Sequence, residues 1–131
     1  MSPYIAAVTL LTVLLMTATG FLVGRARGLH GIKAPATSGH PDFDRAFRVQ
    51  MNTLEASVMF LPALWVAGSF GDARLAAAFG GVWLIGRVWY AASYLAAPEK
   101  RGAGFGIAFL ALVLLLVQGG WALAAKLLAG A

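Results

Sequence analysis

The sequence predicts an all-α integral membrane protein, folded as an up-down bundle of four transmembrane helices. Of its 131 residues, 60% are hydrophobic and only 11% are charged, and the mean hydropathy is +0.80. A soluble domain of this size could not bury so much apolar surface. Two runs, residues 4–23 and 105–125, contain no charged residue. Each is long enough to cross a hydrocarbon core about 30 Å thick.

The first two expected helices differ in polarity. Residues 4–23 form the first span, and because no Lys or Arg precedes this full-length run, we expect a span and not a cleaved signal peptide. The second span covers residues 43–70, and its polar first third should project beyond the lipid or into a cavity. Pro41 and Asp42 predict where this helix starts. Pro62 is expected to kink it, because membrane helices tolerate proline.

The last two spans are expected at residues 73–97 and 105–125. Asp72 closes a short turn and is the expected N-cap of the third helix. The loop at residues 98–104 is only long enough to reverse the chain, whereas the glycine- and proline-rich loop at residues 24–41 should pack over the mouth of the bundle. We expect a single membrane domain over the whole chain, without a separate soluble domain.

The charges are unevenly distributed between the two sides of the predicted bundle. Most of the basic residues follow the first and third spans: Arg25, Arg27, Lys33, Arg45, Arg48, Lys100 and Arg101. The positive-inside rule then places both of these loops in the cytoplasm and both termini outside, which means the inner membrane if the cell is bacterial. The net charge of +5 therefore reflects topology and contact with anionic lipid, not nucleic-acid binding.

Two charged residues, Glu55 and Arg87, lie inside apolar spans. An ionised guanidinium near mid-bilayer costs at least about 3 kcal/mol, so Arg87 should face the bundle interior with a partner, for which Glu55 is the expected candidate. Each belongs to a polar stripe at helical spacing. These stripes are Arg48, Asn52 and Glu55 on the second span, and Arg87, Tyr90 and Tyr94 on the third.

Such a set suits a small ligand that carries both an anion and a cation. Guanidinium groups bind carboxylates as a fork, Glu55 could hold an ammonium group, and Asn52 and Gln50 can bond amides. A peptide-like zwitterion fits this description, and grooves between the helices could admit an apolar second substrate. Because the chain has no cysteine, any thiol chemistry must use a thiol of the substrate. His30 and His40 lie in a loop without metal-ligand companions, so no metal is expected.

The polar segments resemble the MAPEG family, the membrane-associated proteins in eicosanoid and glutathione metabolism. The resemblance is carried by the runs at residues 41–55, 87–94 and 98–102, and most specifically by Arg-x-x-x-Asn-x-x-Glu on the second span and Arg-x-x-Tyr-x-x-x-Tyr on the third. It extends over nearly the whole chain, and the most similar subgroup comprises the microsomal glutathione transferases and the leukotriene-forming synthase.

The resemblance implies a homotrimer that binds glutathione between adjacent subunits, near the cytoplasmic side. Positions matching glutathione contacts are Arg48, Asn52, Glu55, Tyr90 and Tyr94 from one subunit, and Arg27 and Gln50 from its neighbour. Arg87 is assigned to the same site. Arg101 matches an arginine held to stabilise the glutathione thiolate, and is the expected catalytic residue. Ala56 stands where the leukotriene-forming synthase has a tyrosine, which argues against leukotriene specificity.

The implied activity is conjugation of glutathione to apolar electrophiles, reduction of lipid hydroperoxides, or both. Two alternatives belong to other classes. A non-enzymatic lipid-binding scaffold is one, although the complete polar stripe argues against it. A small transporter that uses Glu55 and Arg87 as a charge relay is the other. Taken alone, Tyr94 could equally be an interface aromatic, and Arg101 a residue that only sets topology.

Overall fold

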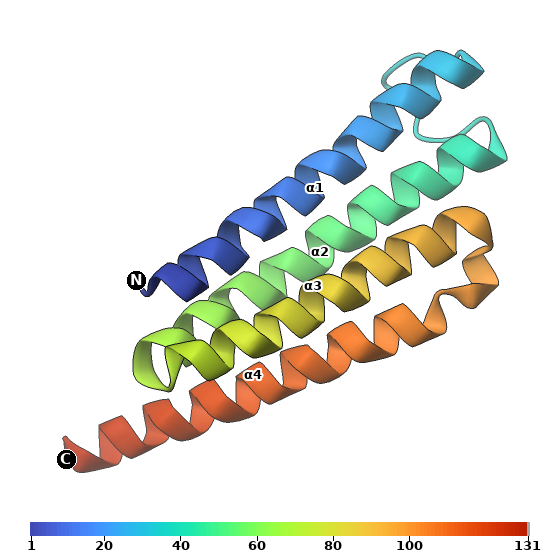
Figure 1. Ribbon diagram of the computed structural model, residues 1–131. Coiled ribbons are helices and arrows are strands. Elements are labelled where there is room, and N and C mark those ends of the chain that lie inside the picture. The colour runs from blue at the N-terminus through green and yellow to red at the C-terminus, as the bar shows by residue number, and fades with distance from the viewer. Residues whose placement is uncertain (131) are drawn as a thin grey trace.

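The computed structural model describes residues 1–130, and it is all helical. The long helices are α1 (Pro3–His30), α2 (Pro41–Phe70), α3 (Ala73–Ala96) and α4 (Gly102–Ala129), with a short 3-10 turn, η1 (Pro98–Lys100), before α4. Four helices are long and apolar enough to cross a membrane. The predicted up-down bundle of four transmembrane helices is therefore confirmed (Figure 1).

The helices run side by side along one direction, and both termini lie at the same end of the bundle (Figure 1). Every extensive helix–helix contact involves α2 or α3, which form the centre. Helices α1 and α4 occupy outer positions. The two connections that carry most of the basic residues, 31–40 and 97–101, consequently lie together at the end opposite the termini.

Local capping explains where the helices begin and end. The side chain of Asp72 accepts hydrogen bonds from the backbone N–H groups of Arg74 and Leu75, as expected for the N-cap of α3. Helix α2 begins with Pro41, as predicted, but its N-cap is His40. Helix α1 ends at His30 and is capped by Gly31, whose φ of 65° places it in the left-handed region that favours glycine.

Two predicted boundaries were wrong. Helix α1 continues through Gly24 and Gly28 to His30, about two turns beyond the expected end, so the loop at this position starts only at residue 31. A methyl group at either glycine would meet nothing within 4 Å, so no close contact requires glycine there, and the cost of about 1 kcal/mol per glycine does not end the helix. Helix α4 likewise starts at Gly102, whereas the apolar pattern predicted a start near residue 105.

The core is mainly apolar at the end of the bundle near the termini and in its middle. The rings of Phe60 and Trp83 stack with their centroids 3.9 Å apart, and Leu64 is fully buried beside them. Helices α3 and α4 approach closely where Gly86 faces Gly104. A Cβ atom on Gly104 would lie 2.8 Å from the Cα atom of Tyr90, so this glycine sets how closely the two helices pack.

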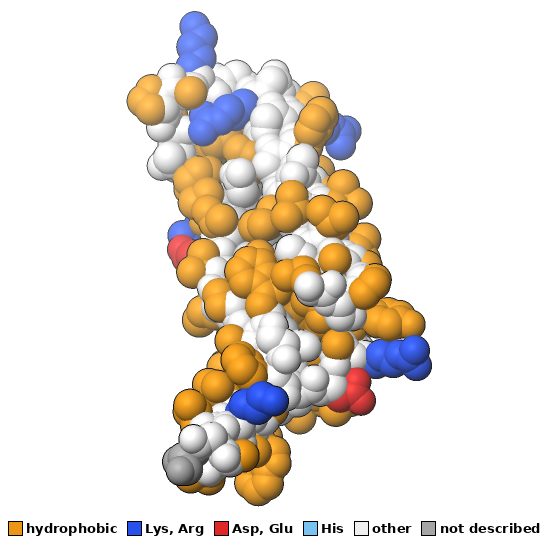
Figure 2. Space-filling model, turned by 90° about the vertical axis from the view of Figure 1, so that its left-hand side faces the viewer, with side chains coloured by type: hydrophobic (Ala, Val, Ile, Leu, Met, Phe, Trp, Pro, Cys, Tyr) orange, Lys and Arg blue, Asp and Glu red, His pale blue; other side chains and the backbone are white. Residues whose placement is uncertain are grey.

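The surface agrees with a membrane environment. On the face shown in Figure 2, most of the side chains between the two ends are hydrophobic, and most Lys and Arg side chains lie toward the ends. Large apolar side chains such as Leu10, Phe21 and Leu116 are more than half exposed. An aqueous surface would not carry so many of them, whereas lipid accepts them at no cost.

Candidate functional site

The structure joins the two predicted polar stripes across the interface between α2 and α3. The amide of Asn52 donates a hydrogen bond to the Tyr90 hydroxyl oxygen at 2.6 Å, and Arg48 donates to the Asn52 side-chain oxygen at 3.4 Å. The ring of Tyr94 lies 5.7 Å from that of Tyr90. Because the Tyr90 oxygen accepts this bond, its own O–H remains free to donate to a ligand.

Arg87 supports this network from inside the bundle. Its side chain is only 3% exposed, its Nη2 donates to the Thr53 hydroxyl at 3.1 Å, and its guanidinium lies 4.1 Å from the centroid of the Tyr90 ring. The cation therefore fixes the ring from one side while Asn52 bonds its hydroxyl. Arg87 is part of the predicted site, but it is placed behind Tyr90 and not at the surface of the chain.

The predicted ion pair between Glu55 and Arg87 is wrong within this chain. Glu55 is exposed, whereas Arg87 is buried, and the only ion pair within residues 1–130 involves His30. The prediction assumed that two residues at the same depth in the membrane would be in contact. The side chains of Glu55 and Arg87 instead leave their helices in different directions, one to the surface and one to the interior. Thr53 and the π face of Tyr90 replace the expected carboxylate.

The two residues expected to act toward a neighbouring subunit lie away from this network. Arg27, near the end of α1, donates to the carbonyl of Ala36 at 2.8 Å, and its guanidinium lies 4.8 Å from the ring centroid of Phe43. Gln50 points to α1, where its amide nitrogen would lie 3.1 Å from a Cβ atom on Gly20. Neither residue shares a hydrogen bond with Asn52 or Tyr90 in the described chain.

Arg101 lies at the start of α4, at the same end of the bundle. Its side chain is exposed and donates to the carbonyl of Pro98 at 2.9 Å. It forms no hydrogen bond with the Tyr90 network in the described residues. Its guanidinium is therefore held beside the turn η1 with donors left for a ligand.

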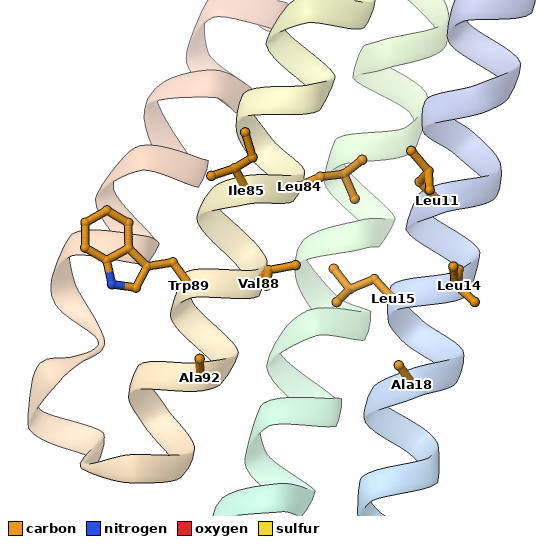
Figure 3. A pocket seen from close by; sticks show the side chains of 9 residues that line it. All are labelled: Leu11, Leu14, Leu15, Ala18, Leu84, Ile85, Val88, Trp89 and Ala92. Carbon is orange, nitrogen blue, oxygen red and sulfur yellow. The ribbon is translucent and has the colours of Figure 1, made fainter.

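A large groove in the described part of the chain lies between α1 and α3 and is entirely apolar (Figure 3). It has a volume of about 650 Å³, and its α3 wall includes Ile85, Val88 and Trp89. These residues lie on the opposite face of α3 from Arg87 and Tyr90, because a step of three or four residues keeps a face and a step of two leaves it. Helix α3 therefore separates this groove from the polar network.

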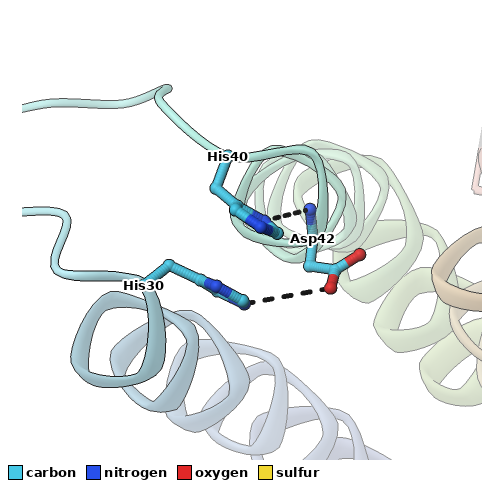
Figure 4. A group of neighbouring side chains, drawn as sticks. All are labelled: His30, His40 and Asp42. Carbon is cyan, nitrogen blue, oxygen red and sulfur yellow. Dashed lines mark hydrogen bonds and ion pairs between the residues drawn. The ribbon is translucent and has the colours of Figure 1, made fainter.

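The structure corrects the expectation that His30 and His40 lack metal-ligand companions. Their rings stack with centroids 3.7 Å apart, and Asp42 lies beside them, with its Oδ2 3.9 Å from His30 Nε2 (Figure 4). One ligand atom from each residue lies within 4.8 Å of the others. However, His40 Nδ1 already accepts the backbone N–H of Asp42. This arrangement caps α2 and ties it to the end of α1.

Thr53 is the residue of this cluster that the pattern analysis missed. It is fully buried, as is Ser57 one turn later, although both lie in an apolar span. A pair of hydroxyl residues at i and i+4 within such a span was the available signal, because it marks a helix face turned to the interior.

A comparison with known families identifies this arrangement. The MAPEG family model matches residues 5–121, which include most of each of the four helices and the complete Arg48–Asn52–Tyr90 network. The chain belongs to the MAPEG family. The resemblance predicted from the two stripes is thereby confirmed.

Individual members of the family are similar over most of the chain. An uncharacterized protein of Synechocystis is 45% identical over 112 residues, which cover 86% of this chain and 82% of that protein. Microsomal glutathione S-transferase 2 of Mus musculus is 39% identical, with coverage of 88% and 79%. Leukotriene C4 synthase of Cavia porcellus is 40% identical, with coverage of 86% and 75%.

Proposed function

We propose that this MAPEG protein is a glutathione-dependent membrane transferase. The observation that carries the proposal is the Asn52–Tyr90 hydrogen bond at 2.6 Å, which assembles the family's two polar stripes into one surface. The names of its relatives, glutathione S-transferase and leukotriene C4 synthase, agree with a thiol of glutathione as co-substrate. A lipid-binding scaffold would have no need for this hydrogen-bonded polar surface.

The donors and acceptors at this surface match the chemistry of glutathione. Arg48 supplies a guanidinium fork for a carboxylate, and the Tyr90 hydroxyl supplies a further donor. Glu55 is exposed on the same stripe of α2 and provides an anion for the ammonium group of glutathione. Arg87 acts as a positioning residue for Tyr90. Tyr94 adds an aromatic wall beside Tyr90.

The remaining predicted contacts come from the other copies of the chain in a homotrimer. Arg48 and Glu55 are exposed on a helix that crosses the membrane, and charged side chains in that setting cost free energy unless protein or ligand covers them. We expect a neighbouring copy to cover this face and to contribute Arg27 and Gln50. The site would then lie between subunits at the end with the basic loops, which the positive-inside rule places in the cytoplasm.

Arg101 is the residue proposed to activate the thiol. A cysteine thiol has a pKa of about 8.5, so only a few per cent is thiolate at neutral pH. A nearby guanidinium in a water-poor pocket favours the thiolate, and a decrease of about two pKa units corresponds to roughly 2.7 kcal/mol. The exposed Arg101 side chain has donors available for this role.

The proposed reaction starts with the glutathione thiolate beside an electrophile dissolved in lipid. In conjugation, the sulfur attacks an electrophilic carbon, a C–S bond forms and the bond to the leaving group breaks with its electron pair. In the peroxidase reaction, two glutathione molecules are oxidised to the disulfide while a lipid hydroperoxide is reduced to an alcohol and water. Neither reaction requires a metal.

The proposal is tested by titrating purified protein with glutathione and recording the ultraviolet absorbance of the thiolate. We expect saturable binding, a thiolate signal and turnover of an aryl halide. Arg101→Ala should lower turnover by about 100-fold and remove the thiolate signal, because one electrostatic stabiliser typically contributes this much. Its glutathione affinity should change by less than about threefold. Lys126→Ala, at the other end of the bundle, is the control. Absence of glutathione binding would refute the proposal.

A further inference from the structure

The N-cap of α2 is a histidine side chain. His40 Nδ1 accepts the backbone N–H of Asp42 at 3.1 Å, and the His40 backbone has the extended conformation of an N-cap residue. The caps of α1 and α3 are instead oxygen atoms, from Ser2 and Asp72. Histidine is the side chain that ordinarily changes charge between about pH 5 and 8. Helix α2 therefore begins at a group that loses its capping lone pair when it takes up a proton.

The capping bond defines the protonation state of His40. A ring nitrogen accepts a hydrogen bond only while it carries no proton, so the imidazole is neutral and its single N–H group is at Nε2. A metal ion needs a free lone pair, and this tautomer has none left because Nδ1 is already engaged. The cluster of His30, His40 and Asp42 is therefore better suited to sense a proton than to hold a metal.

A proton on His40 has several unfavourable effects at the start of α2. It removes the acceptor of the Asp42 N–H group, and it places a positive charge at the positive end of the helix dipole. The ring of His30 stacks on the His40 ring with the centroids 3.7 Å apart (Figure 4), so two protonated rings would also repel each other. The closed arrangement is therefore specific to neutral His40.

The charged groups nearby do not cancel these effects. Asp42 Oδ2 lies 3.9 Å from His30 Nε2, so this carboxylate can pair with a proton on His30, but it cannot restore the lost cap. Asp44 already accepts the backbone N–H of Gly39 at 3.1 Å. The other charged residues between positions 25 and 45 are all basic: Arg25, Arg27, Lys33 and Arg45. Their sign opposes a further positive charge.

The same cap holds the segments that position Arg27. Arg27 donates to the carbonyl of Ala36 at 2.8 Å, in the loop that ends at His40. Its guanidinium also lies 4.8 Å from the ring centroid of Phe43, in the first turn of α2. The two contacts of Arg27 thus lie on either side of the cap. An opening of the first turn of α2 would release Arg27 from both.

We propose that the α1–α2 joint, formed by His30, His40 and Asp42, is a pH-sensitive switch. The joint is closed while His40 is neutral, and it opens as the pH falls, because only the neutral ring caps α2. Opening frees the loop at residues 31–40 and releases Arg27. The switch does not depend on the glutathione proposal, since all its groups lie in α1, the loop and α2. If both hold, opening withdraws Arg27 from the glutathione site.

The test uses a spin label on the full chain in lipid nanodiscs. Because the protein has no cysteine, Thr37→Cys places a single label in the exposed loop. We expect the mobile fraction of the label to be at least about threefold larger at about pH 5.5 than at about pH 7.5, since an N-cap typically shifts the equilibrium of a helix end by about fivefold. A label at Ser69→Cys, beside the carboxylate cap of α3, should give the same spectrum at both pH values.

Two substitutions in the labelled protein separate the histidines. His40→Asn supplies a good N-cap that takes up no proton, so the closed joint should persist and the two spectra should agree within about 1.3-fold. His30→Phe keeps a stacked ring but removes the second positive charge, so the response should remain, with its midpoint at higher pH. Whether these samples bind glutathione tests the proposed function and not the switch.

The proposal makes His40 the group that titrates. An unchanged loop label between the two pH values in the wild type would overturn it. A response in His40→Asn equal to that of the wild type would overturn it as well, and so would a response that is lost in His30→Phe and kept in His40→Asn.

Discussion

The two halves of the α2–α3 interface are held together by different forces. Toward the termini, the rings of Phe60 and Trp83 stack in parallel within the hydrophobic core, with their centroids 3.9 Å apart. Toward the basic loops, the same two helices are joined by the Asn52–Tyr90 hydrogen bond and by Arg87, which bonds Thr53. The first half depends on shape and dispersion, and the second on the placement of a few donors.

This difference separates stability from function within one helix pair. Close apolar packing holds the helices at a fixed distance, and lipid does not compete for it once the helices fit. The polar half gives less net stability, because each polar group also costs desolvation. In return its hydrogen bonds hold Tyr90 and Arg48 in a fixed geometry, as the proposed glutathione site requires. Substitutions in the apolar half should therefore lower stability more than glutathione affinity, and substitutions in the polar half should do the reverse.

The largest effect is expected in the apolar half. Trp83→Ala should lower the free energy of unfolding in detergent by about 3 to 5 kcal/mol, because it removes the partner of Phe60 and leaves a cavity. The glutathione affinity of the folded fraction should stay within about threefold of the wild type. Trp89→Ala is the control, since Trp89 is 48% exposed. A collapse of glutathione affinity in well-folded Trp83→Ala protein would contradict the separation.

An intermediate effect is expected in the polar half. Asn52→Ala should weaken glutathione binding by about 10- to 100-fold, since it removes a proposed ligand contact and frees the Tyr90 side chain. The free energy of unfolding should fall by only about 1 kcal/mol. Calorimetric titration and denaturant unfolding of the same preparation measure the two quantities. A large loss of stability with unchanged affinity would make Asn52 a structural residue.

The smallest effect is expected at Gly104, where α4 packs against the polar half of the interface. Gly104→Ala places a methyl group against the backbone of Tyr90 and Gly86, closer than a Cβ atom can pack, so the backbones of α3 and α4 must move apart there. We expect about 1 to 2 kcal/mol of destabilisation and a loss of glutathione affinity of about threefold to tenfold. Gly106→Ala, where the added methyl group meets nothing within 4 Å, should leave both unchanged. Equal behaviour of the two variants would show that α4 does not position Tyr90.

Hydropathy and the spacing of charged residues were sufficient to predict the fold. Long uncharged runs can only be spans, and Asp72 marks a helix start by a local rule, so these features did not depend on tertiary structure. The end of α1 could not be predicted this way. Gly24 and Gly28 each cost about 1 kcal/mol relative to alanine in a helix, yet α1 continues through both.

The candidate site was predictable as two stripes but not as a set of contacts. Helical spacing puts Arg48 with Asn52 and Arg87 with Tyr90, and the family match covers all of them. Spacing does not specify how two helices rotate against each other. That rotation buries Arg87 against Thr53 and leaves Glu55 exposed, which is why the expected ion pair was wrong.

Because α1 continues to His30, Arg27 belongs to the same uninterrupted helix that crosses the membrane. The 28 residues of this helix extend about 42 Å, which exceeds a hydrocarbon core of about 30 Å. A helix that is longer than the membrane adjusts to it by tilting, and the tilt moves both of its ends. The position of Arg27 relative to α2 is therefore linked to bilayer thickness. Lipids of different acyl length would therefore change the position of Arg27 relative to α2 without contacting Arg27 itself.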